Sequence, residues 1–249
     1  MAKVISIINQ KGGVGKTTTT CSLAAALSLK GKKVLLVDLD PQANASESLG
    51  VEDYDNNIYQ ALKGESEISP IKVMNNLDIV PSSIDLNVLE HEMTNEPGRE
   101  YLLKELIASI KDNYDFIIID CSPSIGLIAL NALSACDTFI IPVLPHHLSI
   151  QGLSGLAGVA KKVKSRINPK LKLEGVLITQ FSHRKILHRD VQKALKKHFK
   201  GRLYDSTIRE NISLAEAPST GMDIFRYSPN SNGAEDYLKL CEEFLSKQS

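Results

Sequence analysis

Residues 3–18 read KVISIINQKGGVGKTT and join an apolar, β-branched run directly to a glycine-rich loop. The run Lys3–Asn9 predicts a strand, and Thr17–Leu29 has the pattern of a helix. Glycines at such a junction let backbone N–H groups converge on phosphate oxygens, and the helix N-terminus adds partial positive charge. This stretch therefore predicts a phosphate-binding loop over residues 11–18.

Each position of this loop has an expected contact with a nucleotide. Lys16 is placed for the β- and γ-phosphates, the Thr17 hydroxyl for Mg²⁺, and Thr18 for the α-phosphate. We therefore expect ATP with Mg²⁺ as the ligand. The predicted contacts from the loop are Lys11, Gly12, Gly13, Val14, Gly15, Lys16, Thr17 and Thr18.

The start of the loop departs from the usual pattern. That pattern has a glycine five residues before Gly15, where this chain has Gln10, followed by a second lysine, Lys11. A lysine here that cannot fold back onto its own phosphates could reach a nucleotide bound by another subunit. A solvated surface lysine is an equally good interpretation of Lys11 taken alone.

Strand and helix patterns alternate along the rest of the chain. Because the apolar runs are nearly continuous in Val, Ile and Leu, they indicate strands covered on both faces. The predicted strands are Lys3–Asn9, Lys33–Asp38, Leu77–Pro81, Asp115–Asp120, Thr138–Val143, Leu173–Thr179 and Leu203–Ile208. The predicted helices are Thr17–Leu29, Arg99–Lys111, Leu127–Ala135, Gly152–Lys164, Arg189–Lys200 and Ala234–Lys247. This order predicts an α/β fold with a doubly wound, mostly parallel sheet, helices on both faces and one domain over residues 1–249. The least regular segment, 44–76, is a candidate for movement.

Carboxylates follow two of the predicted strands. Asp38 and Asp40 end the strand at Lys33–Asp38, and Asp120 ends an Ile-Ile-Ile run. In parallel sheets, ligands bind at the carboxyl edge, and Mg²⁺ would give a buried aspartate the partner that it needs. We expect Asp120 to hold Mg²⁺ through water. The spacing alone does not choose between Asp38 and Asp40.

Composition and charge narrow the class of protein. The content of 43% hydrophobic and 23% charged residues is typical of a soluble globular protein, and no apolar run approaches the ~20 residues of a membrane span. The N-terminus has no signal-peptide pattern. We interpret Cys21, Cys121, Cys136 and Cys241, which show no CxxC spacing, as reduced core thiols of a cytosolic protein.

The net charge of zero conceals a basic segment. Residues 161–202 hold 14 Lys or Arg and two acids, a local charge of +12. In Arg189–Lys200, apolar residues follow a helical period and cations fill the other faces. A solvated helix surface explains such a run as well as a polyanion-binding surface does. The candidate DNA contacts are Arg184, Lys185, Arg189, Lys193, Lys196, Lys197, Lys200 and Arg202.

Four motifs in order resemble the ParA/Soj partition ATPases, in the deviant Walker A group that includes MinD and the nitrogenase iron protein. They are residues 9–18 (NQKGGVGKTT), 37–45 (VDLDPQANA), 119–124 (IDCSPS) and 214–219 (LAEAPS). The resemblance covers essentially the full chain.

The resemblance implies a homodimer that encloses two ATP molecules, with Lys11 reaching the partner's phosphates. It favours Asp40 over Asp38 for positioning the attacking water. The implied catalytic residues are thus Lys11, Lys16 and Asp40, and the implied metal-site residues are Thr17, Asp40 and Asp120. It also implies adenine contacts from Arg209 and Asn211, with Gln180 and Phe181 nearby.

Two departures from the family pattern concern function. Many members have Gln-x-Glu where this chain has Leu144-Pro145-His146, and the role of His146 and His147 stays open, with packing or surface as the plain interpretation. Many members also have Pro-Arg-Asn-Val-Arg where residues 209–213 read RENIS. Ser213 thus replaces a basic residue, and the DNA footprint is expected to shift.

The leading hypothesis is a slow Mg²⁺-dependent ATP hydrolase, cytoplasmic and nucleoid-associated. ATP would dimerise it on non-specific double-stranded DNA, and a ParB-like centromere-binding partner would trigger hydrolysis and release. A MinD-like membrane-associated positioning ATPase is the alternative, but acids in residues 233–249 would repel anionic lipid, so no membrane partner is expected. An iron–sulfur electron carrier would need paired thiolates, which the isolated cysteines of this chain do not provide. A synthetase that activates a small-molecule carboxylate remains possible.

Overall fold

The computed structural model describes residues 1–52, 54–146 and 149–248, without the side chains of residues 149–152. Within these ranges the strands form one eight-stranded sheet in the order β3-β4-β2-β5-β1-β6-β7-β8. Their bounds are β1 (Lys3–Ile7), β2 (Val34–Leu39), β3 (Ile71–Met74), β4 (Leu77–Val80), β5 (Phe116–Cys121), β6 (Thr138–Val143), β7 (Lys172–Phe181) and β8 (Leu203–Arg209). All described neighbours pair in parallel except β3 and β4.

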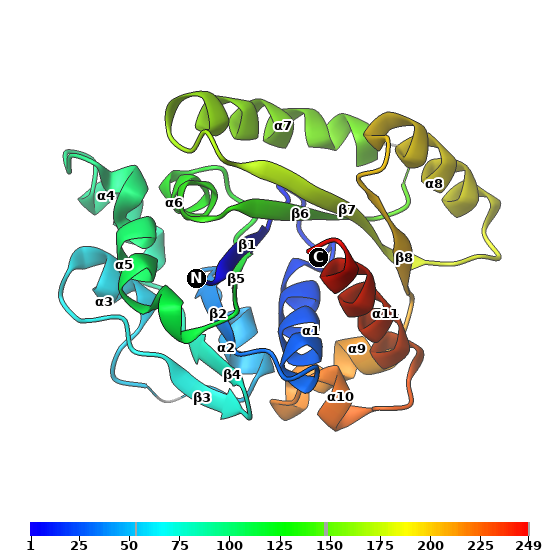
Figure 1. The fold of residues 1–249 in the computed structure, drawn as a ribbon, viewed down its shortest axis with the longest axis horizontal. Coiled ribbons are helices and arrows are strands. Elements are labelled where there is room, and N and C mark those ends of the chain that lie inside the picture. Colours follow the sequence, from blue (N-terminus) through cyan, green and yellow to red (C-terminus); the bar gives the residue numbers. More distant parts are fainter. Residues whose placement is uncertain (53, 147–148, 249) are drawn as a thin grey trace.

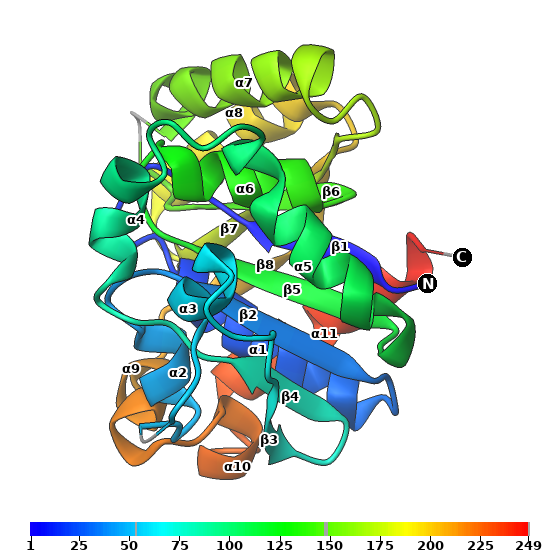
Figure 2. The same cartoon turned by 90° about the vertical axis from the view of Figure 1, so that its left-hand side faces the viewer.

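Helices cover both faces of this sheet (Figures 1 and 2). The α-helices are α1 (Lys16–Leu29), α2 (Asn44–Ser48), α3 (Ile58–Lys63), α4 (Leu86–Glu92), α5 (Leu102–Ile110), α6 (Leu127–Ala135), α7 (Ser149–Arg166), α8 (Ile186–Phe199), α9 (Ile212–Glu216), α10 (Ile224–Tyr227) and α11 (Asn232–Ser246). Short 3₁₀ turns are η1 (Arg99–Tyr101), η2 (Lys111–Asn113) and η3 (Ala217–Thr220). The predicted doubly wound α/β fold is confirmed.

Two apolar cores lie on the two faces because successive strand residues point to opposite sides. On β2, Leu35 and Val37 face the core shared with α3 to α8, whereas Val34 and Leu36 face the core shared with α1 and α11. A strand such as β5 is buried along its whole length for this reason. The nearly continuous apolar runs therefore predicted these central strands within a few residues.

The edge beyond β4 is where the prediction was incomplete. Segment 44–76 holds α2, α3 and the antiparallel strand β3, which the sequence pattern did not reveal. Because β3 is an edge strand, it is only partly buried, with Lys72 exposed, and it lacks the continuous apolar run of the central strands. Helix α3 begins at a capping box in which Asn57 and Gln60 exchange hydrogen bonds.

The sheet brings the ends of β1, β2 and β5 together. In register, Ile7 of β1 and Asp38 of β2 both pair with Asp120 of β5, so the loops that follow these strands share one edge. The chain ends N and C lie together at the opposite edge (Figure 2). In the described part of the chain, no helix is both long and apolar enough to cross a membrane.

Candidate nucleotide site

The glycine-rich loop joins β1 to α1 at the carboxyl edge of the sheet. Asn9 fixes its start, because the Asn9 side chain donates to Pro142 O at 2.7 Å and accepts from Lys11 N at 3.1 Å. Gly13 (φ 70°) and Gly15 (φ 81°) adopt left-handed backbone conformations that favour glycine. Gly15 is also the N-cap of α1, so the loop leads directly into the helix N-terminus.

Two side chains in the first turn of α1 are those that we expect to bind the phosphates and the metal ion. Lys16 is buried, with 7% of its surface exposed, and its Nζ lies 3.4 Å from Lys11 O. The Thr17 hydroxyl donates to Asp120 Oδ2 at 2.7 Å. The sequence placed Thr17 and Asp120 at one magnesium site from separate motifs, and the structure brings them into contact.

Asp38 and Asp120 form a buried pair of carboxylates on adjacent strands. Both are fully buried, and desolvation raises the pKa of Asp38 to about 6 and that of Asp120 to about 7. The negative charge of Asp38 adds to the rise at Asp120, while the hydroxyls of Thr17 and Thr20 oppose it. Closely spaced buried carboxylates favour a bound cation, and oxygen donors are the ligands that Mg²⁺ prefers.

These residues fit a magnesium ion held mainly by phosphate and water. Among the residues that the structure describes, no three His, Cys, Asp or Glu side chains gather into a site for a metal ion. Mg²⁺ typically uses one or two protein oxygens with waters and substrate phosphates, so this donor set suits it. The Thr17 hydroxyl and the Asp120 carboxylate are the two groups that would hold the ion.

Asp38 and Asp40 have different hydrogen-bond partners. The Asp38 carboxylate accepts from Ser46 N at 2.9 Å and from Asp40 N at 3.1 Å, so it holds the loop that follows β2. Asp40 lies two residues further along, directly after β2, and is 7% exposed, with Oδ1 accepting from Gln42 N at 3.0 Å. Ser46 thus occupies the Asp38 carboxylate, and the choice of Asp40 over Asp38 for the attacking water stays a prediction.

A cavity of 460 Å³ opens beside the phosphate loop and has the size of a small-molecule site. Its walls come from the loop, the ends of β7 and β8, the segment after β8, and α11. Its lining residues are Gly15, Thr18, Thr179, Gln180, Ile208, Arg209, Glu210, Asn211, Ile212, Leu214, Ala215 and Tyr237. Because the cavity adjoins the phosphate loop, it is where we expect the nucleoside to bind.

Three of the four predicted adenine contacts line this cavity. Gln180 also donates from Nε2 to Gly13 O at 3.3 Å, and Asn211 caps α9 by accepting from Ser213 N at 2.8 Å. The Arg209 guanidinium is held by Asp236, whose Oδ1 lies 2.6 Å from Arg209 Nη2. Phe181 does not reach the cavity: it is 1% exposed and lies in the core with α8.

Sequence reasoning missed several residues that build this site. Thr20 donates to Asp120 Oδ1 at 2.9 Å, and Thr179 donates to Val14 O at 2.8 Å. Tyr237 of α11 lines the cavity and contacts Thr19 Oγ1 at 3.1 Å. Thr20 lies one turn beyond Thr17 and carried a usable signal, whereas Thr179 and Tyr237 come from distant segments.

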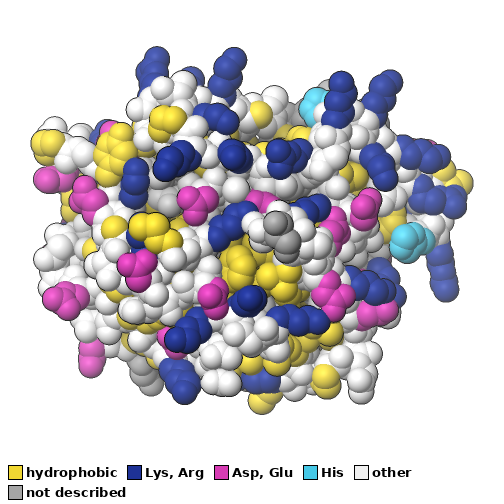
Figure 3. Space-filling model, in the orientation of Figure 1, with side chains coloured by type: hydrophobic (Ala, Val, Ile, Leu, Met, Phe, Trp, Pro, Cys, Tyr) yellow, Lys and Arg dark blue, Asp and Glu magenta, His cyan; other side chains and the backbone are white. Residues whose placement is uncertain are grey.

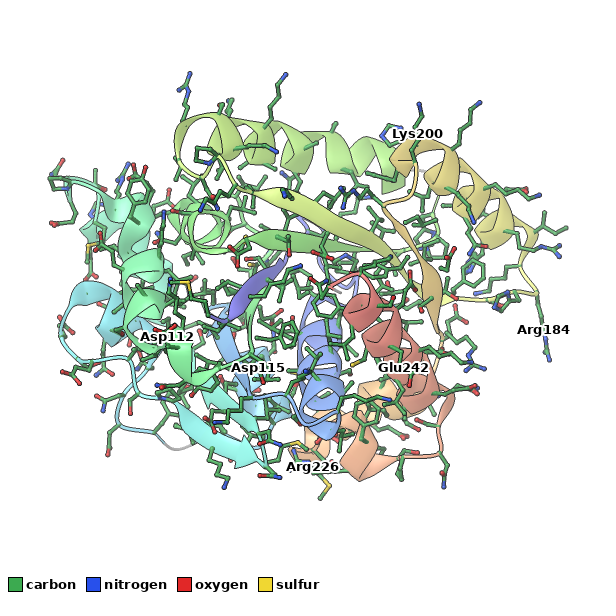
Figure 4. The ribbon with its side chains drawn as sticks, viewed as in Figure 1. Asp112, Asp115, Arg184, Lys200, Arg226 and Glu242 are labelled. Carbon is green, nitrogen blue, oxygen red and sulfur yellow. The ribbon has the colours of Figure 1, made fainter. Side chains whose placement is uncertain are left out.

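The predicted DNA contacts lie on and around α8, away from the phosphate loop. Arg184 and Lys200, at the two ends of this helix, point away from the body of the molecule (Figure 4). Three of the eight cations face acids: Lys185–Glu210 at 2.7 Å, Lys193–Asp190 at 3.8 Å and Lys196–Asp205 at 3.5 Å. Figure 3 shows dark blue side chains along the upper edge, over α7 and α8.

The remaining predicted residues are placed as follows. All four cysteines are buried and free of disulfides. Lys11 is exposed at the start of the loop. His146 is exposed just after β6, and His147 lies outside the described residues.

A glycine loop on a strand–helix turn, a buried Thr–Asp contact and an adjoining cavity define a P-loop nucleotide-binding protein. The AAA domain family matches residues 2–173. The sporulation initiation inhibitor protein Soj of Bacillus subtilis (strain 168) is 44% identical over 248 residues, which cover 98% of each chain. The chain belongs to the ParA/Soj family of partition ATPases.

Solved structures share this fold. The Mycobacterium smegmatis cobyrinic acid a,c-diamide synthase with bound ATP analog and magnesium has a TM-score of 0.88 at 31% identity, covering 100% of this chain and 96% of that one. A plasmid partition protein from Borrelia burgdorferi has a TM-score of 0.81 at 31% identity, covering 99% of each chain.

Proposed function

We propose that this chain is an ATP-driven DNA segregation switch. It binds ATP with Mg²⁺, forms a homodimer around two nucleotides and binds double-stranded DNA without sequence preference on the nucleoid. A ParB-like centromere-binding protein stimulates hydrolysis and release. The observation that carries the proposal is the 2.7 Å contact between Thr17 Oγ1 and Asp120 Oδ2, with Asp40 in the loop after the neighbouring strand.

The residues of the site account for a slow hydrolase. Backbone N–H groups of the loop and Lys16 bind the phosphates, and Thr17 with Asp120 holds the metal, which neutralises phosphate charge when bound. Asp40 orients the attacking water. Catalysis then rests on positioning and charge stabilisation, so basal turnover is slow in the absence of a Glu general base.

Lys11 is the residue that supports the proposed dimer. This lysine is exposed at the loop entrance, and in the proposed dimer it would contact the nucleotide of the partner subunit. A dimer doubles the number of cations that one DNA segment meets. Because affinity for DNA falls steeply with salt for each phosphate contact, doubling the contacts makes ATP-gated dimerisation an effective DNA switch.

Co-sedimentation with plasmid DNA under ADP and ATP tests the proposal. ATP with Mg²⁺ should increase the bound fraction, and the Lys16→Ala protein should lose this gain because it cannot hold the nucleotide or dimerise. The Asp40→Ala protein should keep ATP binding and remain trapped as a DNA-bound dimer. Equal DNA binding with ADP and ATP, or normal ATP hydrolysis by Asp40→Ala, would contradict the proposal.

A small-molecule synthetase is the second candidate, supported by the likeness to the Mycobacterium smegmatis synthase. A synthetase uses the same phosphate loop to activate a carboxylate, but its turnover does not need a polyanion. Stimulation of ATP hydrolysis by DNA with a ParB-like protein supports the switch. Stimulation by a small carboxylic acid, with none by DNA, supports the synthetase.

A further inference from the structure

A row of cations lies outside the helix on which the DNA contacts were predicted. Residues 161–172, from the last turns of α7 to the first residue of β7, contain no Asp or Glu. All of their Lys and Arg side chains are exposed. We call these six residues the α7 ridge: Lys161, Lys162, Lys164, Arg166, Lys170 and Lys172.

Buried residues of α7 and hydrogen bonds in the turn after it hold the ridge in place. Leu156, Ala160 and Val163 of α7 are buried against the sheet, so the lysines between them must point outward. The turn after α7 is held by Asn168, whose Nδ2 donates to Leu133 O at 3.0 Å, Ser134 O at 3.2 Å and Cys136 O at 2.7 Å. The cations therefore project from a rigid surface, which reduces the entropy lost when a ligand binds.

Lys162 and Arg166 line a cavity with Glu90 and Glu100, but neither is close enough to these acids to form an ion pair. Within the described part of the chain, no ion pair involves any of the six ridge cations, whereas three of the eight cations around α8 face acids. Glu174, the next acid along the chain, forms a salt bridge with Lys3, with Oε2 2.8 Å from Nζ. The partial negative charge at the C-terminal end of α7 stabilises only Lys164 and Arg166, which lie in its last turn.

We propose that the α7 ridge is a second contact surface for the phosphate backbone of duplex DNA. This inference rests on the proposed DNA-binding function. The helix segment from Lys161 to Arg166 is about 7.5 Å long, and duplex DNA of that length carries about four phosphate charges, matching its four cations. No aromatic residue lies in 161–172, so the surface lacks the stacking platforms that single strands use.

The ridge lies at the end of α7 that is farther from α8, and both groups of cations lie along the upper edge of the molecule (Figures 1 and 3). A duplex laid along this edge meets both helices and extends the footprint beyond the residues that sequence reasoning selected. Because every contact is to the backbone, the ridge adds affinity and salt dependence without base preference.

The test neutralises four ridge cations together as Lys161→Gln, Lys162→Gln, Lys164→Gln and Arg166→Gln. The matched control removes four cations from the other end of the sheet, as Lys32→Gln, Lys33→Gln, Lys72→Gln and Lys104→Gln. Fluorescence anisotropy with a labelled 30-base-pair duplex, ATP analogue and Mg²⁺ gives the affinity of each full-length protein. Circular dichroism confirms that both variants are folded.

The ridge variant should have a log–log salt slope shallower by about 3.6 per protomer, since each phosphate contact contributes about 0.9. Between 50 and 200 mM salt the wild type should thus lose roughly 100-fold more affinity per protomer than the ridge variant. The control variant should keep the wild-type slope. If the ridge variant has the same salt slope as the control variant while the wild type binds DNA, the ridge inference is overturned and the proposed function stands. If the wild type binds no DNA in the presence of nucleotide, both the ridge inference and the proposed function are overturned. If the ridge variant loses binding to anionic vesicles but not to DNA, the ridge inference is also overturned.

Discussion

Replacing Asp120 with Asn should stabilise the nucleotide-free protein and at the same time weaken its binding of Mg²⁺ with nucleotide. Asp120 is fully buried beside Asp38, and its carboxylate accepts from the hydroxyls of Thr17 and Thr20. The amide can keep this geometry, because Thr20 Oγ1 also lies 3.0 Å from Lys16 O. The hydroxyl can therefore donate to that carbonyl and accept from the amide.

The size of the gain follows from the pKa of Asp120. Burial and the charge of Asp38 raise this pKa from 3.8 to about 7 in the folded state. Between these two values the folded protein holds a proton that the unfolded chain has lost, so stability falls as pH rises from about 4 to 7. Each pKa unit corresponds to about 1.4 kcal/mol, which gives a cost on the order of 4 kcal/mol above pH 7. Asp120→Asn removes this cost.

Urea denaturation of the nucleotide-free proteins in EDTA, followed by circular dichroism, measures the effect at pH 5 and pH 8. The gain in unfolding free energy from Asp120→Asn should be about 2–3 kcal/mol larger at pH 8 than at pH 5. Asp112→Asn, at an exposed acid on the surface, is the control and should stay within about 0.5 kcal/mol at both pH values (Figure 4). A variant that is less stable at pH 8, or gains equally at both, refutes the reasoning. So does ATP with Mg²⁺ protecting the variant as well as the wild type.

Three further changes test other parts of the structure. Glu210→Gln frees Lys185, now 2.7 Å from Glu210 Oε1, and should steepen the log–log salt slope of DNA binding by about 0.9 per protomer, measured by anisotropy. Asn168→Ala leaves three carbonyls at the end of α6 without their donor. It should cost about 1–3 kcal/mol of unfolding free energy and lower the melting temperature by about 2–4 °C per kcal/mol. Gly175→Ala places a Cβ 2.4 Å from Tyr204 Cε2 in the core, and urea denaturation should show a loss of about 1–3 kcal/mol.

The sequence predicted the central sheet because burial on both faces leaves a strong pattern. Strands such as β5 and β6 are buried at every position and read as nearly continuous apolar runs. Helices α2, α9 and α10 have four or five residues each, which is too short for a period to emerge. Their positions are set by side-chain caps, such as Asp223 at the start of α10, and by packing against distant segments.

The choice between Asp38 and Asp40 shows what spacing cannot supply. Both residues follow the same strand and point to the same side, so the pattern treats them alike. The difference comes from Ser46, whose backbone N–H and hydroxyl both donate to Asp38 Oδ2, at 2.9 and 2.8 Å. A residue eight positions away thus binds the Asp38 carboxylate, and only the folded loop reveals this contact.

The cavity beside the phosphate loop is connected to the start of α8 through the ends of β7 and β8. Strands β7 and β8 end side by side, with Phe181 paired to Arg209. Gln180, just before this pair, lines the cavity and donates to Gly13 O of the phosphate loop, in a left-handed backbone conformation (φ 51°) that is rare for glutamine. Glu210, just after it, lines the same cavity and holds Lys185 at the start of α8. A nucleotide that moves either cavity residue therefore acts on the segment from which α8 begins, with no need for a longer path through the core.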